Sequence, residues 1–190
     1  MRTTVSFLIG CVVGATGVLM WVHETSASPA SPDSLPAPVA AARAAAVETG
    51  LLIPVDGVRP TDLRRDFDDR RSGGRAHEAL DIRAPRNTPV VAVADGTIRK
   101  LFTSKAGGLT IYQYDTAEQL CYYYAHLERY ANGIREGMTV SRGDVIGYVG
   151  TTGNAPPDTP HLHFAVTKLL PTKEWWKGEA LDPYPMLVSP

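Results

Sequence analysis

The sequence has little cysteine and almost no net charge. Its 190 residues include two cysteines, and 19 Lys and Arg are balanced by 20 Asp and Glu, which leaves a net charge of −1. Two cysteines are too few for a disulfide scaffold or a four-cysteine zinc finger, and the balanced charge lacks the basic footprint of a nucleic-acid-binding protein. The hydrophobic content of 44% is too high for a disordered protein. We therefore expect a folded domain that binds no nucleic acid.

A long uncharged run opens the chain. The 20 residues Thr3–Val22 carry no charge, and as a helix they would rise about 30 Å, the thickness of the hydrocarbon core of a membrane. Arg2 precedes the run, and the next Lys or Arg after it is Arg43. Because positive charge favours the cytoplasmic side, this asymmetry predicts a cytoplasmic N-terminus and an exported remainder.

Three interpretations of this N-terminal segment are open, and each of them exports the rest of the chain. We favour a signal anchor over residues 1–23, since the run is long and ends near Trp21, a residue type enriched at membrane interfaces. The second interpretation is a cleaved signal peptide with a small-residue site at Thr25–Ala27. The third is a lipoprotein, because Leu8–Cys11 is similar to a lipobox.

A linker and one folded domain are expected to follow. Ala, Pro and Ser make up 17 of the 25 residues from 25 to 49, a composition that cannot bury enough apolar surface to offset its ordering entropy. We predict a disordered linker over residues 24–49 and a domain over residues 50–190, with its motifs within residues 75–169. Cys121 is the one cysteine outside the apolar run, so we expect no internal disulfide and a buried core thiol.

Short β-rich runs separated by turn residues predict a mainly β domain. Asp95-Gly96 lies between two of these runs and is typical of a β-hairpin turn. Residues 64–75 and 150–160 have the composition of loops. The expected strands cover residues 88–94, 97–102, 109–114, 120–127, 138–140, 145–149 and 161–168.

The four histidines of the predicted domain fall in three short motifs. His77 and Asp81 are spaced as H-x-x-x-D, His126 follows three consecutive tyrosines, and His161 and His163 form H-x-H. Each motif alone has an ordinary interpretation, as a surface ion pair or as a packed side chain. Their occurrence together in one β domain favours a metal site.

Strand alternation predicts which of these side chains share a face. Successive residues of a strand point to opposite faces, so His161 and His163 lie side by side while Leu162 and Phe164 face the core. The same alternation predicts that His126 shares its face with Tyr122 and Tyr124, which could then line a groove beside it.

Imidazole and carboxylate groups are ligands that zinc accepts, and catalytic zinc sites use three protein ligands and leave one position for water. His77, Asp81 and one histidine of the 161/163 pair would supply two nitrogens and one oxygen. The remaining histidines suit proton transfer or stabilisation of an oxyanion, because imidazole titrates near neutrality.

The motifs resemble those of the lysostaphin/LytM-type zinc metallopeptidases over about residues 52–169. The resemblance covers the first metal motif, the middle motif, a glycine-rich hairpin and loop, and the last metal motif. The matching segments are His77–Ile82, Ala84-Pro85, Thr88–Val90, Val93–Gly96, Tyr124–Leu127, Gly143–Gly147, Gly150–Asn154 and Pro160–Phe164.

This resemblance implies a compact, mostly antiparallel β-sheet or β-sandwich domain that holds one Zn²⁺ per chain. It implies that His77, Asp81 and His163 are the zinc ligands and that His126 and His161 are catalytic histidines. We assign His161 to accept the proton of the attacking water and His126 to stabilise the oxyanion, and the exchanged assignment stays open.

The activity implied by the resemblance is zinc-dependent hydrolysis of peptide bonds in peptidoglycan stem peptides or cross-links. With the N-terminal segment as a membrane contact, the domain would lie in the periplasm, anchored by a single pass in the bacterial inner membrane, or free if a signal is cleaved. Two positions depart from the family pattern: Ala79 replaces the usual Gly, and Ala165 replaces a frequent acidic residue.

Two other functions are weighed against the peptidase. One is a non-catalytic relative that activates other cell-wall hydrolases, which the presence of all five site residues disfavours. The other is a biotinyl- or lipoyl-type carrier, suggested by the glycine-rich hairpins of residues 137–150, but no lysine occupies a hairpin tip there. Outside the motifs, Trp175 and Trp176 either contact glycan or belong to a C-terminal strap packed on the domain.

Overall fold

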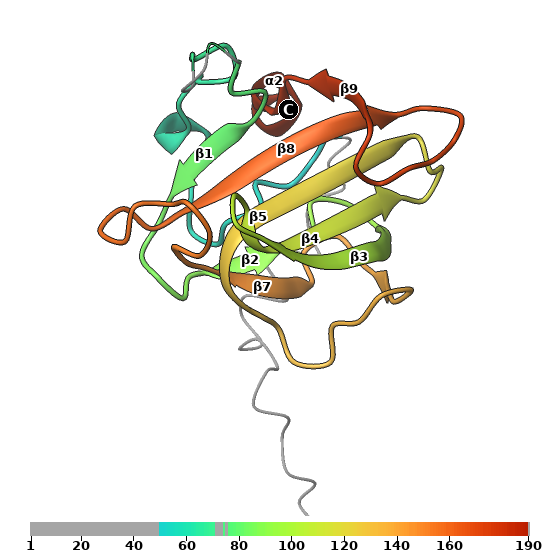
Figure 1. Ribbon diagram of the computed structural model, residues 1–190, viewed down its shortest axis with the longest axis horizontal. Coiled ribbons are helices and arrows are strands. Elements are labelled where there is room, and N and C mark those ends of the chain that lie inside the picture. The colour runs from blue at the N-terminus through green and yellow to red at the C-terminus, as the bar shows by residue number, and fades with distance from the viewer. Residues whose placement is uncertain (1–49, 71–73, 75, 190) are drawn as a thin grey trace, which may run out of the picture. The chain divides into compact units, whose positions relative to one another are not determined.

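A computed structural model describes residues 50–70, 74 and 76–189 (Figure 1). The expected membrane segment and linker lie outside these residues, as does Cys11. Among the described residues, none forms a helix that is both long and apolar enough to cross a membrane.

The described chain is built almost entirely of strands, with one short helix near its end and a single 3-10 turn near its start. The elements are η1 (Pro60–Asp62), β1 (Leu80–Arg83), β2 (Pro89–Val91), β3 (Gly96–Ser104), β4 (Gly108–Asp115), β5 (Leu120–Tyr130), β6 (Thr139–Val140), β7 (Val145–Val149), β8 (His161–Leu169), β9 (Gly178–Leu181) and α2 (Pro183–Val188).

The nine strands form one antiparallel sheet, which confirms the prediction of a mainly β, mostly antiparallel domain. The main path runs in the order β1-β8-β5-β4-β3-β6, and β9 extends it beside β8. The long strands β8, β5 and β4 lie side by side across the middle of Figure 1. β7 pairs with the end of β5 and with β2, so these two short strands branch from the main path.

One face of this sheet packs on the core, and the burial of alternate residues along β8 shows which face it is. Leu162, Phe164 and Val166 are fully buried, whereas His163 and Ala165 between them are partly exposed. We call the face that carries His163 the open face. The core face of β8 packs on a hydrophobic cluster that includes residues of β2 and β7. The open face is left for the polar side chains of the strand.

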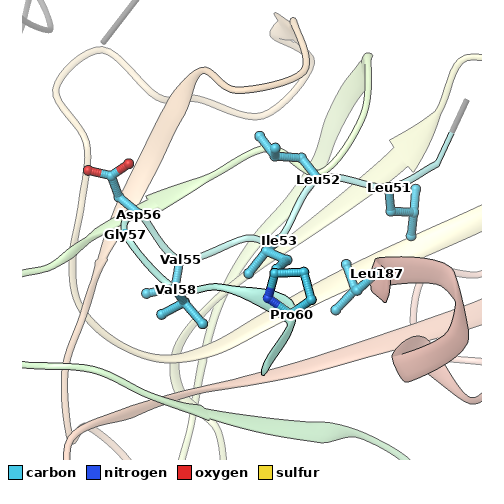
Figure 2. A pocket seen from close by; sticks show the side chains of 9 residues that line it. All are labelled: Leu51, Leu52, Ile53, Val55, Asp56, Gly57, Val58, Pro60 and Leu187. Carbon is cyan, nitrogen blue, oxygen red and sulfur yellow. The ribbon is translucent and has the colours of Figure 1, made fainter. Parts of the chain in front are cut away.

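The C-terminal segment packs on the domain as a strap. β9 pairs with residues 166–169 at the C-terminal end of β8. Asp182 is the N-cap of α2, and its carboxylate accepts a hydrogen bond from Tyr184 N at 2.9 Å. Leu187 of α2 is buried in the core cluster. Leu187 also lines an apolar hollow together with side chains of residues 51–60 (Figure 2). No histidine lines this hollow.

The predicted hairpin at Asp95-Gly96 is wrong. β3 pairs with β4 and β6, whereas β2 pairs with β7, so the two strands that flank this dipeptide are not partners. Asp95 accepts a hydrogen bond from Arg142 N at 2.7 Å. A Cβ atom on Gly96 would lie 2.0 Å from the carbonyl oxygen of Tyr114. Glycine is required there for close approach of two backbones and not for a turn.

This close approach predicts that Gly96→Ala destabilises the domain by about 3 kcal/mol or more, because a rigid backbone atom must move. Gly133→Ala is the matched control. Gly133 has a φ of +79°, and a Cβ atom there would have no neighbour within 4 Å, so only about 1–2 kcal/mol of backbone strain is expected. Denaturant unfolding measures both. Equal losses in the two variants would contradict the packing argument.

Candidate metal centre

Pairing of two strands brings the predicted metal residues together. β1 pairs with β8 so that Asp81 lies directly opposite His163 on the open face. His77 precedes β1, and its Nε2 atom lies 3.1 Å from Asp81 Oδ1 and 3.1 Å from His163 Nδ1. His163 Nδ1 lies 2.9 Å from Asp81 Oδ1. Three candidate ligand atoms therefore converge on one point.

The separations of these atoms fit a bound metal ion. Ligands held about 2.0–2.1 Å from zinc in a tetrahedron are separated by about 3.3 Å, close to the observed 2.9–3.1 Å. Two imidazole nitrogens and one carboxylate oxygen are donors that zinc accepts. Within the described ranges, His77, Asp81 and His163 are the one group of three or more such side chains able to hold a metal ion.

The Nδ1 side of the His77 ring is held by Asp66, a residue that the sequence analysis did not identify. Backbone hydrogen bonds from His77 N to Asp69 O and from Glu78 N to Phe67 O, both 2.9 Å, bring the preceding loop against the motif. His77 Nδ1 then donates to Asp66 O at 2.9 Å, and the Asp66 carboxylate lies 3.6 Å away. A carbonyl oxygen can only accept, so the proton sits on Nδ1 and Nε2 is left for a metal.

Burial and carboxylates act in opposite directions on His77. Burial lowers its pKa, whereas hydrogen bonds to Asp66 and Asp81 raise it, and the result is a pKa of about 9. A metal ion at Nε2 therefore competes with a proton that the same two carboxylates stabilise.

His126 reaches the open face because β5 is irregular at this residue. His126 has a φ of +60°, and the pairing of β5 with its neighbours shifts register around it. A bulge of this kind adds one residue and reverses the side-chain alternation. The His126 ring consequently lies 4.9 Å from the ring of His161 and 5.7 Å from that of His163.

The prediction that Tyr122 and Tyr124 share the face of His126 is wrong for the same reason. Both tyrosines are buried in the core, and Tyr124 donates a hydrogen bond to Gln113 at 2.7 Å. Of the three consecutive tyrosines, Tyr123 lies on the open face, and its ring lies 6.0 Å from that of His163. An unbroken alternation cannot reveal a bulge.

Each non-ligand histidine is fixed by a carbonyl oxygen. His126 Nδ1 donates to Thr152 O at 2.8 Å, and His161 Nδ1 donates to Thr159 O at 2.9 Å. Both rings therefore keep Nε2 free of that proton in the neutral state. Burial lowers the pKa of His126 to about 4, although the hydrogen bond to Thr152 opposes this effect. His161 Nε2 lies 3.9 Å from Asp81 Oδ1.

The glycine-rich loop before β8 positions the carbonyl that holds His126. Thr152 Oγ1 donates to Leu127 O at 2.8 Å and accepts from Leu109 N at 3.0 Å. Gly153 follows with a φ of +77°, and a Cβ atom there would lie 2.3 Å from Gly108 N. The loop is thus fitted directly against β4 and β5, which explains its small residues.

The two departures from the family pattern occupy different environments. Ala79 is buried beside β1, whereas Ala165 is partly exposed on the open face, directly opposite Tyr123. Neither position supplies a candidate ligand atom, so the three convergent donors are unaffected.

Comparisons with known proteins find relatives of the domain that carries these residues. The model of peptidase family M23 matches residues 75–183, more than half of the chain. An L-Ala–D-Glu endopeptidase of Bacillus subtilis is 36% identical over 141 residues, which cover 67% of this chain and 42% of that protein. The peptidoglycan DD-endopeptidase ShyC of Vibrio cholerae is 33% identical over 55% of this chain and 25% of its own length. The chain thus spans less than half the length of these curated relatives.

Solved structures show the same fold. The catalytic domain of lysostaphin from Staphylococcus simulans superposes with a TM-score of 0.53 at 27% identity and covers 75% of this chain and 91% of that one. A putative glycyl-glycine endopeptidase LytM from Ruminococcus gnavus gives a TM-score of 0.59 at 26% identity, with 72% and 59% covered.

The three convergent donors predict how substitutions affect metal content. His163→Ala removes one ligand of the three, so tightly bound metal should be lost after desalting. His126→Ala and His161→Ala should keep one metal ion per chain, since neither residue is a ligand. Elemental analysis by mass spectrometry measures this ratio. A full complement of metal in His163→Ala would show that the ligand assignment is wrong.

Proposed function

This chain belongs to peptidase family M23, and we propose that it is a zinc endopeptidase that cleaves peptide bonds in peptidoglycan stem peptides or cross-links. The observation that carries the proposal is the convergence of three ligand atoms within about 3 Å of one another, with two further imidazoles beside them. The relatives named as peptidoglycan endopeptidases support this substrate class.

His77, Asp81 and His163 would hold the metal, and Asp66 would orient His77 through its carbonyl oxygen. When bound, zinc lowers the pKa of a coordinated water to about 7 and polarises a carbonyl oxygen. The protein contributes the remaining proton transfers through the two imidazoles that share the open face with the ligands.

The geometry favours His126 as the proton acceptor and His161 as the oxyanion donor, the exchanged form of the sequence-based assignment. Burial keeps His126 neutral at neutral pH, and its Nδ1 proton is committed to Thr152, so Nε2 can accept but not donate. His161 is the other imidazole beside the ligands, with Nε2 3.9 Å from Asp81 Oδ1, and we assign the oxyanion to it.

From the N-terminal part of the chain we also propose where in the cell the protein is located. The uncharged run in residues 1–23 would anchor the protein in the bacterial inner membrane, or direct its secretion. The Ala/Pro/Ser-rich residues 24–49 would let the peptidase domain of residues 50–190 reach the cell wall from the periplasmic side.

Purified full-length protein in detergent is expected to release peptide fragments from intact peptidoglycan. A chelator should abolish the release, and added zinc should restore it. Mass spectrometry of the fragments identifies the bond that is cut. If the chain releases nothing under any metal condition but stimulates another wall hydrolase, it is a regulator and the proposed function is wrong.

The roles of the two imidazoles predict different chemical rescue. His126→Ala should lower kcat by about 10²–10⁴-fold, as expected for loss of a general base, and free imidazole should restore part of the rate. His161→Ala should lose about 10²–10³-fold and respond less, because stabilisation of an oxyanion depends on a donor that is held in a fixed position. Rescue of His161→Ala alone would return the roles to the sequence-based assignment.

A further inference from the structure

We propose that five aromatic side chains next to the metal residues bind the glycan strand of peptidoglycan by stacking on its sugar rings. This inference rests on the proposed function, since it extends the substrate from the peptide to the sugars that carry it. We call these residues the aromatic row: Tyr123, Tyr112, Trp175, Phe102 and Trp176.

The aromatic row starts at a metal ligand and crosses the open face. The ring of Tyr123 lies 6.0 Å from that of His163 and 4.7 Å from that of Tyr112. Tyr123 is directly opposite Ala165 on one side and Tyr112 on the other, so all three side chains lie on the same face as His163. The row is therefore continuous with the metal centre.

The far end of the row comes from a different part of the chain and is exposed. Trp175 lies in the connection from β8 to β9, and its ring is 4.6 Å from Tyr112 and 5.3 Å from Phe102. Trp176 lies 5.1 Å from Trp175. The exposed fractions of Phe102 and Trp176 are 40% and 61%, and no other large hydrophobic residue of the described ranges is exposed. Exposed apolar side chains that are joined into one patch, as Phe102 and Trp176 are through Trp175, are typical of a binding surface.

The connection that carries the tryptophans is fastened to the sheet. Tyr114 on β4 donates to Lys173 O at 2.6 Å, and the Cys121 thiol on β5 lies 3.9 Å from Trp175 O. Burial raises the pKa of that thiol to about 12, which keeps it a neutral S–H donor. Because the backbone is held before a ligand arrives, little ordering entropy remains to be lost on binding.

The chemistry of peptidoglycan selects the sugar as the partner of these rings. Its stem peptides consist of small and charged residues without aromatic or large apolar side chains. Its pyranose rings present flat faces of C–H groups, which pack on indole and phenyl rings while their hydroxyls stay in water.

The test compares two substrates that differ only in the glycan. One is intact peptidoglycan, and the other is the same cross-linked peptide after enzymatic removal of the sugars. Trp176→Ala should raise KM on intact peptidoglycan at least fivefold and change kcat/KM on the glycan-free peptide by less than twofold. Trp176→Phe, which keeps a stacking ring, is the matched control and should restore KM.

An equal change on both substrates, or no change on either, would overturn the proposal. Saturation-transfer NMR with a β-1,4-linked tetramer of N-acetylglucosamine separates this outcome from failure of the proposed function. The wild-type chain should show a transfer signal that Trp176→Ala and Phe102→Ala reduce, even if no peptide is cleaved. Absence of the signal in the wild-type chain would contradict glycan binding.

Discussion

The pairing of β1 with β8 is the constraint that every other part of the site requires. It places Asp81 opposite His163, two residues that are far apart in the sequence, and the alternation of β8 then adds His161 on the same face. The opposite face of these strands is closed by the core, because Leu80, Leu162 and Phe164 are fully buried. A register shift by one residue would exchange the two faces and bury the ligands.

A second constraint is strain at His126. A positive φ is uncommon for a residue with a Cβ atom and persists where the surroundings impose it. Here His126 N donates to Gly107 O at 2.8 Å and its ring to Thr152 O at 2.8 Å. The bulge turns a side chain that would lie in the core into one that faces the metal residues. A regular β5 strand would leave the site without the His126 imidazole. The bulge supplies it.

The sequence predicts the parts of this site that depend on regular geometry. The H-x-x-x-D and H-x-H spacings and the alternation of β8 are local properties, and they indicate His77, Asp81 and one histidine of the 161/163 pair. The resemblance selects His163, and the structure brings it to His77 and Asp81. The face of His126 and the role of Asp66 depend on a bulge and on a loop contact, neither of which has a periodic signal. The Asp95-Gly96 prediction failed because Gly96 allows close approach of the Tyr114 backbone, a use of glycine that the dipeptide does not distinguish from a turn.

The proposed chemistry requires one metal ion between His77, Asp81 and His163, with His126 and His161 outside its ligand set. Anomalous X-ray diffraction at the zinc edge, from crystals grown with zinc, locates that ion. We expect a single strong peak within bonding distance of His77 Nε2, Asp81 Oδ1 and His163 Nδ1. A peak coordinated by His126 or His161, or a peak away from all three ligand atoms, would contradict this assignment.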